Sequence, residues 1–185
     1  MEQSELVKMP SGKTHDSITF ILAVPTFLIT WRVMQSATLA AFVTVAFLFG
    51  GLMFGPDLDT NSTEYKRWGV LRILWFPYKV AMPHRSRWSH GLIFGTIIRI
   101  VYFAGAITVF TALGFYVYAT LKGGTPPNVE QIQTIWREIG MWTRDNIGNY
   151  ALLAILAGLW LGAASHTFAD SCGTFLKTGR FDKYL

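Results

Sequence analysis

The chain has 185 residues, of which 51% are hydrophobic and 15% are charged. This low share of charge, against about 25% in ordinary globular domains, excludes a disordered chain, which needs high charge and low hydrophobicity. A single cysteine excludes a disulfide-stapled scaffold and a metal site built from cysteine alone. The net charge of +5 would suit nucleic acid binding, but basic residues also gather on the cytoplasmic side of membrane proteins.

Four long apolar stretches favour the membrane interpretation. About 20 apolar residues suffice to cross a hydrocarbon core of roughly 30 Å. The predicted spans cover about residues 16–33, 37–55, 91–121 and 149–169. So little polar chain could not cover four such helices in water. We therefore predict an all-α, polytopic membrane protein with four transmembrane helices, in which residues 1–185 form a single membrane-embedded domain.

Three connections of different character join the predicted spans. Residues 32–36 form a tight link, and residues 56–90 form a long central segment in which the stretch 67–82 is both aromatic and basic. We interpret this stretch as lying at the membrane interface. Residues 122–148 begin with the turn signal Gly-Gly-Thr-Pro-Pro and continue with apolar residues at helical spacing. That spacing predicts an amphipathic helix at the interface.

The distribution of lysine and arginine predicts the orientation of the chain. With four spans, the two termini and the central segment share one side of the membrane. That side holds eleven of the sixteen Lys and Arg residues, the other side holds four, and Arg99 falls within the third span. Because the cytoplasmic side carries the excess of positive residues, we predict an integral, multi-pass protein whose N- and C-termini are cytoplasmic.

Four polar clusters mark the predicted cytoplasmic ends of the four spans. They are His15-Asp16, Asp57-Leu58-Asp59, His84 with His90, and His166 with Asp170. Spans one and three begin on the cytoplasmic side, and spans two and four end there, so the clusters fall at one depth. Ionisable residues at a span boundary are costly unless they are paired or bind metal. The topology therefore predicts a common site.

The residue types in these clusters predict a metal site. His166 and Asp170 lie four residues apart, which places them on one face of a helix. Imidazoles and carboxylates without a thiolate suit Zn, Mn or Fe and argue against a closed structural zinc site. Two ions bridged by a carboxylate would use nearly all the candidates. The predicted metal ligands are His15, Asp57, Asp59, His84, His90, His166 and Asp170.

Three residues are predicted to assist a metal-bound water acting as nucleophile. Asp16 or Asp59 would accept the proton of that water. Arg85 would hold phosphate or carboxylate oxygens of a substrate. Simpler interpretations stay open, because a lone histidine at a membrane boundary is commonly an interfacial residue, and a His-Asp pair also suits the end of a helix.

Arg99 is a charged residue inside the third predicted span. It follows His90 by nine residues, half a helical turn out of phase, so we predict that it does not face the site. Snorkelling to the interface, pairing elsewhere among the helices and contact with a lipid headgroup all stay open for it.

The order of the motifs resembles the YdjM-like group of small inner-membrane proteins described as metal-dependent hydrolases or metal-binding proteins. The motifs are His15, Pro56-Asp57-Leu58-Asp59, His84-Arg85 with Ser89-His90, and Gly162-Ala163-Ala164-Ser165-His166 with Ala169-Asp170-Ser171. The resemblance covers nearly the whole chain in outline and implies a hydrolase. Thr14, Ser86-Arg87-Trp88 and the long central segment depart from the family pattern.

Together these observations predict a membrane-embedded, metal-dependent hydrolase of a phosphoester or lipid-type substrate. Its nucleophile would be water activated by two divalent metal ions (Zn, Mn or Fe) at the cytoplasmic boundary. The alternative is a non-catalytic metal-binding membrane protein that serves the assembly of a larger complex or the handling of metal. The predicted partners are membrane lipids and further copies or subunits in a membrane complex, and not nucleic acid.

Overall fold

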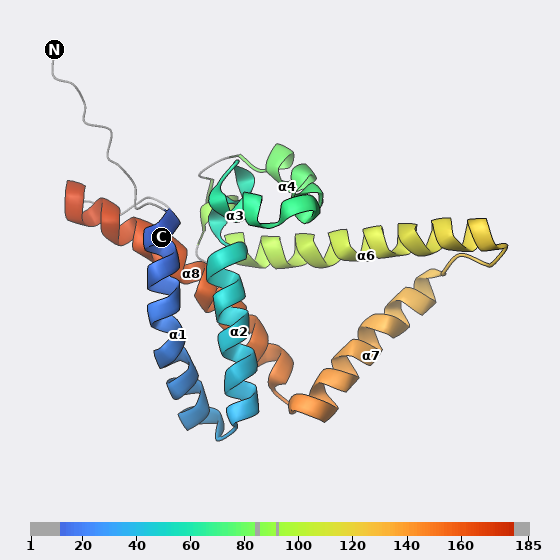
Figure 1. Cartoon of the computed structure of the whole chain (residues 1–185), viewed down its shortest axis with the longest axis horizontal. Coiled ribbons are helices and arrows are strands. Elements are labelled where there is room, and N and C mark those ends of the chain that lie inside the picture. Colours follow the sequence, from blue (N-terminus) through green and yellow to red (C-terminus); the bar gives the residue numbers. More distant parts are fainter. Residues whose placement is uncertain (1–11, 84–85, 92, 180–185) are drawn as a thin grey trace, which may run out of the picture.

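A computed structural model describes residues 12–83, 86–91 and 93–179, and all regular structure within these ranges is helical (Figure 1). The long helices are α1 (Gly12–Met34), α2 (Ala37–Met53), α6 (Phe94–Lys122), α7 (Val129–Ile147) and α8 (Ala151–Thr178). The short helices are η1 (Pro56–Asp59), α3 (Thr63–Arg67), η2 (Gly69–Trp75), α4 (Phe76–Ala81) and α5 (Arg87–His90). The prediction of an all-α fold is therefore confirmed for this part of the chain.

Among the described residues, three helices are long and apolar enough to cross a membrane, namely α1, α6 and the part of α8 from Ala151 to Gly173. Helix α2 is equally apolar but has only 17 residues, the lower limit for a span. Four spans therefore stay a prediction. The observed helices also begin or end up to nine residues away from the predicted spans, most clearly at the end of α8, which runs to Thr178 rather than 169.

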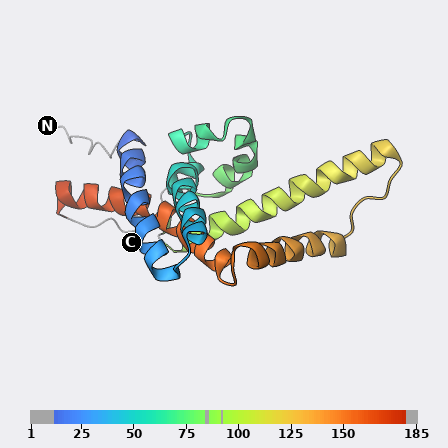
Figure 2. The same ribbon diagram turned by 60° about the horizontal axis from the view of Figure 1, so that its bottom comes forward.

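Helices α1, α2 and α8 pack against one another (Figures 1 and 2). Of these, α1 carries His15 and α8 carries His166 and Asp170. The chain reverses between α1 and α2 at Gln35, whose φ is +52°, and the Ser36 side chain caps α2 by accepting a hydrogen bond from the Leu39 amide at 3.2 Å. Helix α8 meets α2 at Gly158 and Gly162, one turn apart, where the backbones approach so closely that a Cβ would clash with carbonyl oxygens of α2. Such small-residue pairs are the usual means of close helix packing in membranes.

The central segment folds onto the end of α2 and the start of α6 around a cluster of aromatic rings. Trp75 is completely buried at its centre and lies parallel to Phe103, with ring centroids 5.4 Å apart. The ring of Trp68 contacts Trp75, and its indole nitrogen donates a hydrogen bond to the Met53 carbonyl at 2.9 Å. Tyr102 of α6 donates to the Leu74 carbonyl at 2.5 Å. These contacts hold the central segment in one position beside the helices.

This arrangement adds a buried core to the stretch 67–82, whose position at the membrane interface stays a prediction. Its large aromatic side chains Trp68, Trp75 and Tyr78 face inward and form a core. The reason is that 67–82 forms short helical turns, which place some side chains against the end of α2 while others remain outside. Val70 and Phe76 are among the apolar residues of the stretch that stay exposed.

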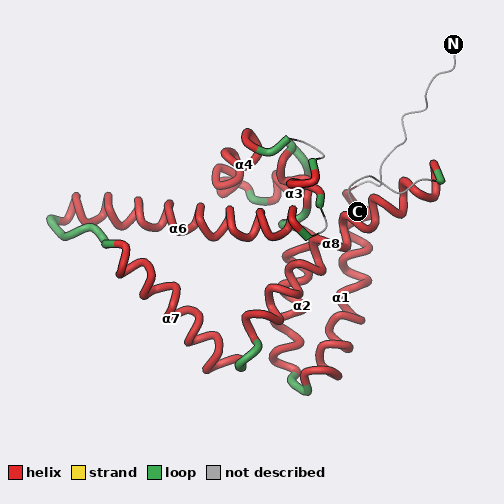
Figure 3. Tube along the Cα trace, turned by 180° about the vertical axis from the view of Figure 1, so that it is seen from behind, coloured by secondary structure: helices red, strands yellow, loops and turns green. Residues whose placement is uncertain are grey.

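Helices α6 and α7 form a second arm of the molecule. In Figure 1, α6 runs across the direction of α1 and α2, and α7 returns from its far end toward α8, as Figure 3 shows from behind. The four apolar helices are therefore not arranged as a parallel bundle. The Trp136 indole of α7 donates to the Thr108 hydroxyl of α6 at 3.1 Å beside an apolar cavity of about 170 Å³. The predicted amphipathic helix is present, capped by Asn128 and Gln131, and its position at an interface stays a prediction.

Candidate metal site

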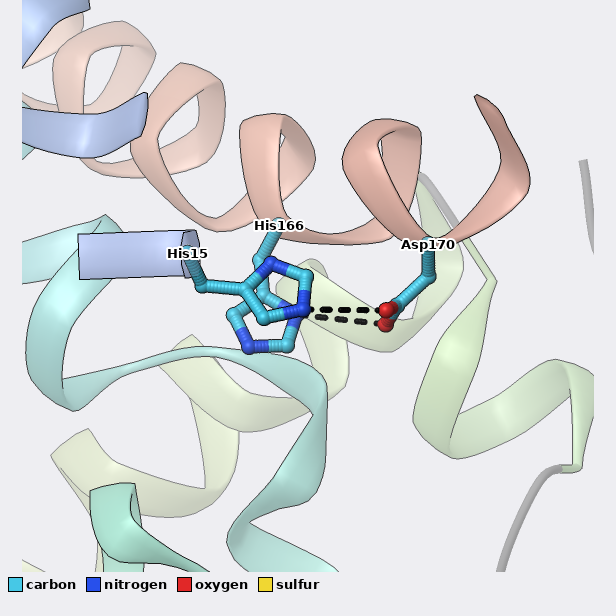
Figure 4. A group of neighbouring side chains, drawn as sticks. All are labelled: His15, His166 and Asp170. Carbon is cyan, nitrogen blue, oxygen red and sulfur yellow. Dashed lines mark ion pairs between the residues drawn. The ribbon is translucent and has the colours of Figure 1, made fainter. Parts of the chain in front are cut away.

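Two histidines and an aspartate from opposite ends of the chain meet in the interior (Figure 4). The imidazoles of His15 and His166 stack face to face, with ring centroids 3.8 Å apart and planes inclined by 8°. The Asp170 carboxylate lies beside both rings: Oδ1 is 3.0 Å from His15 Nε2, and Oδ2 is 3.4 Å from His166 Nδ1. All three side chains are buried, and both histidines are only 5% exposed.

The helices explain how these residues come together. His15 lies in the first turn of α1, while His166 and Asp170 lie one turn apart in the second half of α8. The predicted four-residue spacing therefore places the last two on one face, as expected. Because α1 and α8 both pack on α2, the first turn of α1 meets α8 at His166. The topology prediction thus brought together the first and the fourth of the four clusters.

A second carboxylate, Glu64, completes the surroundings of His166. Its Oε1 lies 3.0 Å from His166 Nε2, the ring nitrogen that faces away from Asp170, and the side chain is buried. Glu64 lies in the first turn of α3, which Ser62 caps by accepting a hydrogen bond from the Tyr65 amide at 3.1 Å. Sequence reasoning missed Glu64 because it lies next to no histidine. Its one signal was an acidic residue in a segment predicted to face the same side as the clusters.

The distances between the ligand atoms fit a bound metal ion. With zinc–nitrogen distances of about 2.0–2.1 Å, neighbouring ligands of a tetrahedral site lie roughly 3.3 Å apart. The two contacts of Asp170 start from its two different oxygens, and their lengths of 3.0 and 3.4 Å are close to this value and are also ordinary ion-pair distances. One ligand atom from each of His15, His166 and Asp170 lies within 4.8 Å of the other two. His166 Nδ1 is buried, and Asp170 Oδ2 is the group it faces among the described residues.

Arg99 is buried next to this group and not directed to lipid or solvent. It is 1% exposed, and its guanidinium donates to the Ser89 carbonyl at 2.6 Å and to the Thr96 hydroxyl at 3.0 Å. It also lies within electrostatic reach of Glu64 and Asp59. Of the three roles left open, pairing within the protein is the observed one.

The predicted phase of Arg99 was counted along a helix that the structure interrupts. The argument assumed one continuous helix from His90 to Arg99, but α5 ends at His90 and α6 begins only at Phe94. Arg99 lies within electrostatic reach of Glu64 and Asp59 on the central segment. Tyr78 of α4 shares this environment, and burial raises the pKa of its phenol although the charge of Arg99 acts in the opposite direction.

The structure places the other predicted site residues as follows. Asp16 forms an ion pair with Arg67 at the edge of the group, with both side chains more than a quarter exposed. Asp59 is buried in η1, and Asp57 of the same turn is half-buried. His84 and Arg85 lie outside the described residues, as does the side chain of His90. The proposed contributions of these residues to the site stay predictions.

The comparisons with known proteins agree with the chemistry of this group. The model of a protein family described as "Uncharacterized metal-binding protein (DUF2227)" matches residues 10–180. The chain belongs to this family. The match extends from before His15 to beyond Asp170, so it contains every residue of the group described above. The family description supports the metal-binding part of the sequence prediction and does not extend to the hydrolase activity that the resemblance implied.

One curated relative shares part of the chain. A region of 59 residues is 36% identical to an uncharacterized protein of Aquifex aeolicus (strain VF5), which covers 31% of this chain and 41% of that protein. The match thus spans less than half of the relative's length. No solved structure matches the chain.

Proposed function

We propose that this protein is an integral membrane protein that binds a divalent metal ion through His15, His166 and Asp170. The observation that carries the proposal is the buried contact of Asp170 with both stacked imidazoles at ligand-to-ligand distances. Family membership supports it independently. Imidazole and carboxylate donors without a thiolate favour Zn, Mn or Fe. The positive residues of the central segment favour placing this end of the helices at the cytoplasmic boundary.

The test is a measurement of metal content in the detergent-purified full-length protein. The protein is stripped with a chelator, reloaded separately with Zn²⁺, Mn²⁺ and Fe²⁺, and analysed by mass spectrometry. The wild type is expected to retain about one equivalent of at least one metal, since three or four protein ligands hold one ion. His15→Ala, His166→Ala and Asp170→Asn are expected to lose it.

A matched control is Asp145→Asn, because Asp145 is an exposed aspartate of α7 that pairs with the neighbouring Arg144. This variant is expected to bind metal like the wild type. Failure of the wild type to retain any of the three metals would contradict the proposal. So would full metal retention by a stably folded His166→Ala variant.

Hydrolysis is a second function that one observation favours. Three protein ligands, as found in the cluster, are the usual number in catalytic zinc sites, where water occupies the fourth position. Metal-loaded protein that hydrolyses phosphoester or lipid substrates, with turnover lost in His15→Ala, would support this function. Retained metal without turnover across such substrates would favour metal handling or complex assembly instead.

A further inference from the structure

The two ring nitrogens of His166 face two different carboxylates. Nδ1 is turned toward Asp170 at 3.4 Å, on the side where His15 also lies, and Nε2 is turned toward Glu64 at 3.0 Å. A neutral imidazole has one nitrogen with a proton and one with a lone pair, and a metal takes the lone pair. Which of the two nitrogens is available to a metal therefore depends on where the proton is held.

We infer that Glu64 is the positioning residue of the metal site: it accepts the Nε2 proton of His166 and thereby leaves the Nδ1 lone pair directed toward Asp170. The inference rests on the proposed metal binding. Metal-ligating histidines generally give their other N–H to a carboxylate, and this partner fixes the tautomer and the orientation of the ring. Glu64 has the position and the chemistry for this role.

The surroundings of Glu64 support a specific contact between its carboxylate and His166 Nε2. Apart from the contact with His166, both oxygens of Glu64 are buried without a hydrogen-bond partner among the described residues. A buried carboxylate is costly unless it has a partner, so the imidazole N–H is the donor that this carboxylate needs. Arg99 adds a buried positive charge within electrostatic reach of the carboxylate. Each of these features favours Glu64 as the acceptor for His166.

Gly55 provides the space that Glu64 occupies. A Cβ at Gly55 would overlap both carboxylate oxygens and the Cδ atom of Glu64. Alanine at this position would therefore displace the carboxylate from its present position beside His166 without removing it. The Gly55→Ala variant thus perturbs the contact by a route independent of any change in the charge of residue 64.

The experiment measures zinc affinity and the tautomer of His166 in full-length protein in detergent. Zinc affinity is measured by competition with a chromophoric chelator for the wild type, Glu64→Ala, Glu64→Gln and Gly55→Ala. Loss of an outer carboxylate partner typically weakens metal binding by about 10–100-fold. Glu64→Ala is expected to fall in this range, and Gly55→Ala is expected to weaken binding in the same direction. Glu64→Gln keeps an acceptor oxygen and is expected to lose less.

Nitrogen-15 spectra of histidine-labelled protein, recorded before zinc is added, provide a readout that a purely structural role would not move. The wild type is expected to carry the His166 proton on Nε2, and Glu64→Ala is expected to lose this preference. Glu138→Gln, at an exposed glutamate of α7, is the matched control and should leave affinity and tautomer unchanged.

Three outcomes would overturn the inference while leaving metal binding intact. The first is unchanged zinc affinity in Glu64→Ala. The second is a loss of zinc in Glu64→Ala as complete as in His166→Ala, which would make Glu64 a direct ligand. The third is a wild-type protein that carries the His166 proton on Nδ1. A wild type that binds no zinc at all would instead contradict the proposed function itself. Gly55→Ala and Glu64→Gln keep the inference testable if Glu64→Ala does not fold.

Discussion

Replacing Gly162 by alanine is expected to lower the free energy of unfolding by about 3 kcal/mol, the upper end of the usual cost of overpacking. A Cβ at this position would overlap the Phe47 carbonyl oxygen and lie 2.8 Å from the Gly51 amide nitrogen. Both atoms belong to the backbone of α2, so no side chain can turn aside. The only relief is to move α8 away from α2.

This movement is expected to reach the metal site, because His166 lies one turn beyond Gly162 on α8. We therefore expect weaker metal binding together with lower stability. The measurement is thermal unfolding in detergent followed by tryptophan fluorescence. A loss of 3 kcal/mol corresponds to a fall in Tm of roughly 6–12 °C for a chain of this size.

The matched control is Gly114→Ala on α6, where a Cβ would meet no atom within 4 Å. Alanine is a better helix former than glycine by about 1 kcal/mol, so this variant is expected to be as stable as the wild type or slightly more so. Equal stability of the two variants would show that the contact between α2 and α8 does not constrain the fold.

The helices and half of the site could be predicted because each depends on local patterns. Long apolar runs predict α1, α2, α6 and α8. Their order along the chain then predicts which helix ends lie on the same side of the membrane. Once the topology was drawn, His15 and the His166–Asp170 pair were expected to meet although they lie at opposite ends of the chain. Composition and spacing were sufficient for these steps.

The other half of the site depends on tertiary packing that the sequence pattern does not contain. Glu64 reaches His166 because the aromatic cluster around Trp75 folds the central segment back onto the helices. No periodic spacing of apolar residues predicts such a cluster within a basic, aromatic stretch. The direction of the Arg99 side chain could likewise not be predicted, because the chain breaks between α5 and α6. A count of residues along one continuous helix does not detect such a break.

Arg99 belongs to this second half through its hydrogen bonds and its charge. Its guanidinium holds the Ser89 carbonyl, and through it α5, against the start of α6. Gly95 allows this close approach, since a Cβ there would lie 2.7 Å from the same carbonyl oxygen. The charge of Arg99 also opposes the negative charges of Glu64 and Asp59 on the central segment. One buried cation thus serves both the packing of α5 and the charge balance beside the metal site.

Arg99→Met is therefore expected to be strongly destabilising, by about 3–5 kcal/mol, although methionine fills much of the same volume. Removing one member of a buried group of charges leaves the others uncompensated, and here it also leaves the buried Ser89 carbonyl without its guanidinium donor. Thermal unfolding checks the size of the loss.

Arg144→Met is the control, because Arg144 is exposed and pairs only with its neighbour Asp145 among the described side chains. A change in the free energy of unfolding within about 0.5 kcal/mol is expected for this variant. Arg99→Lys should fall between the two, since a lysine keeps the charge but cannot reproduce the two guanidinium hydrogen bonds in their fixed geometry. An Arg99→Met protein as stable as the control would mean that the acidic groups beside the site are neutral, or are balanced by other residues.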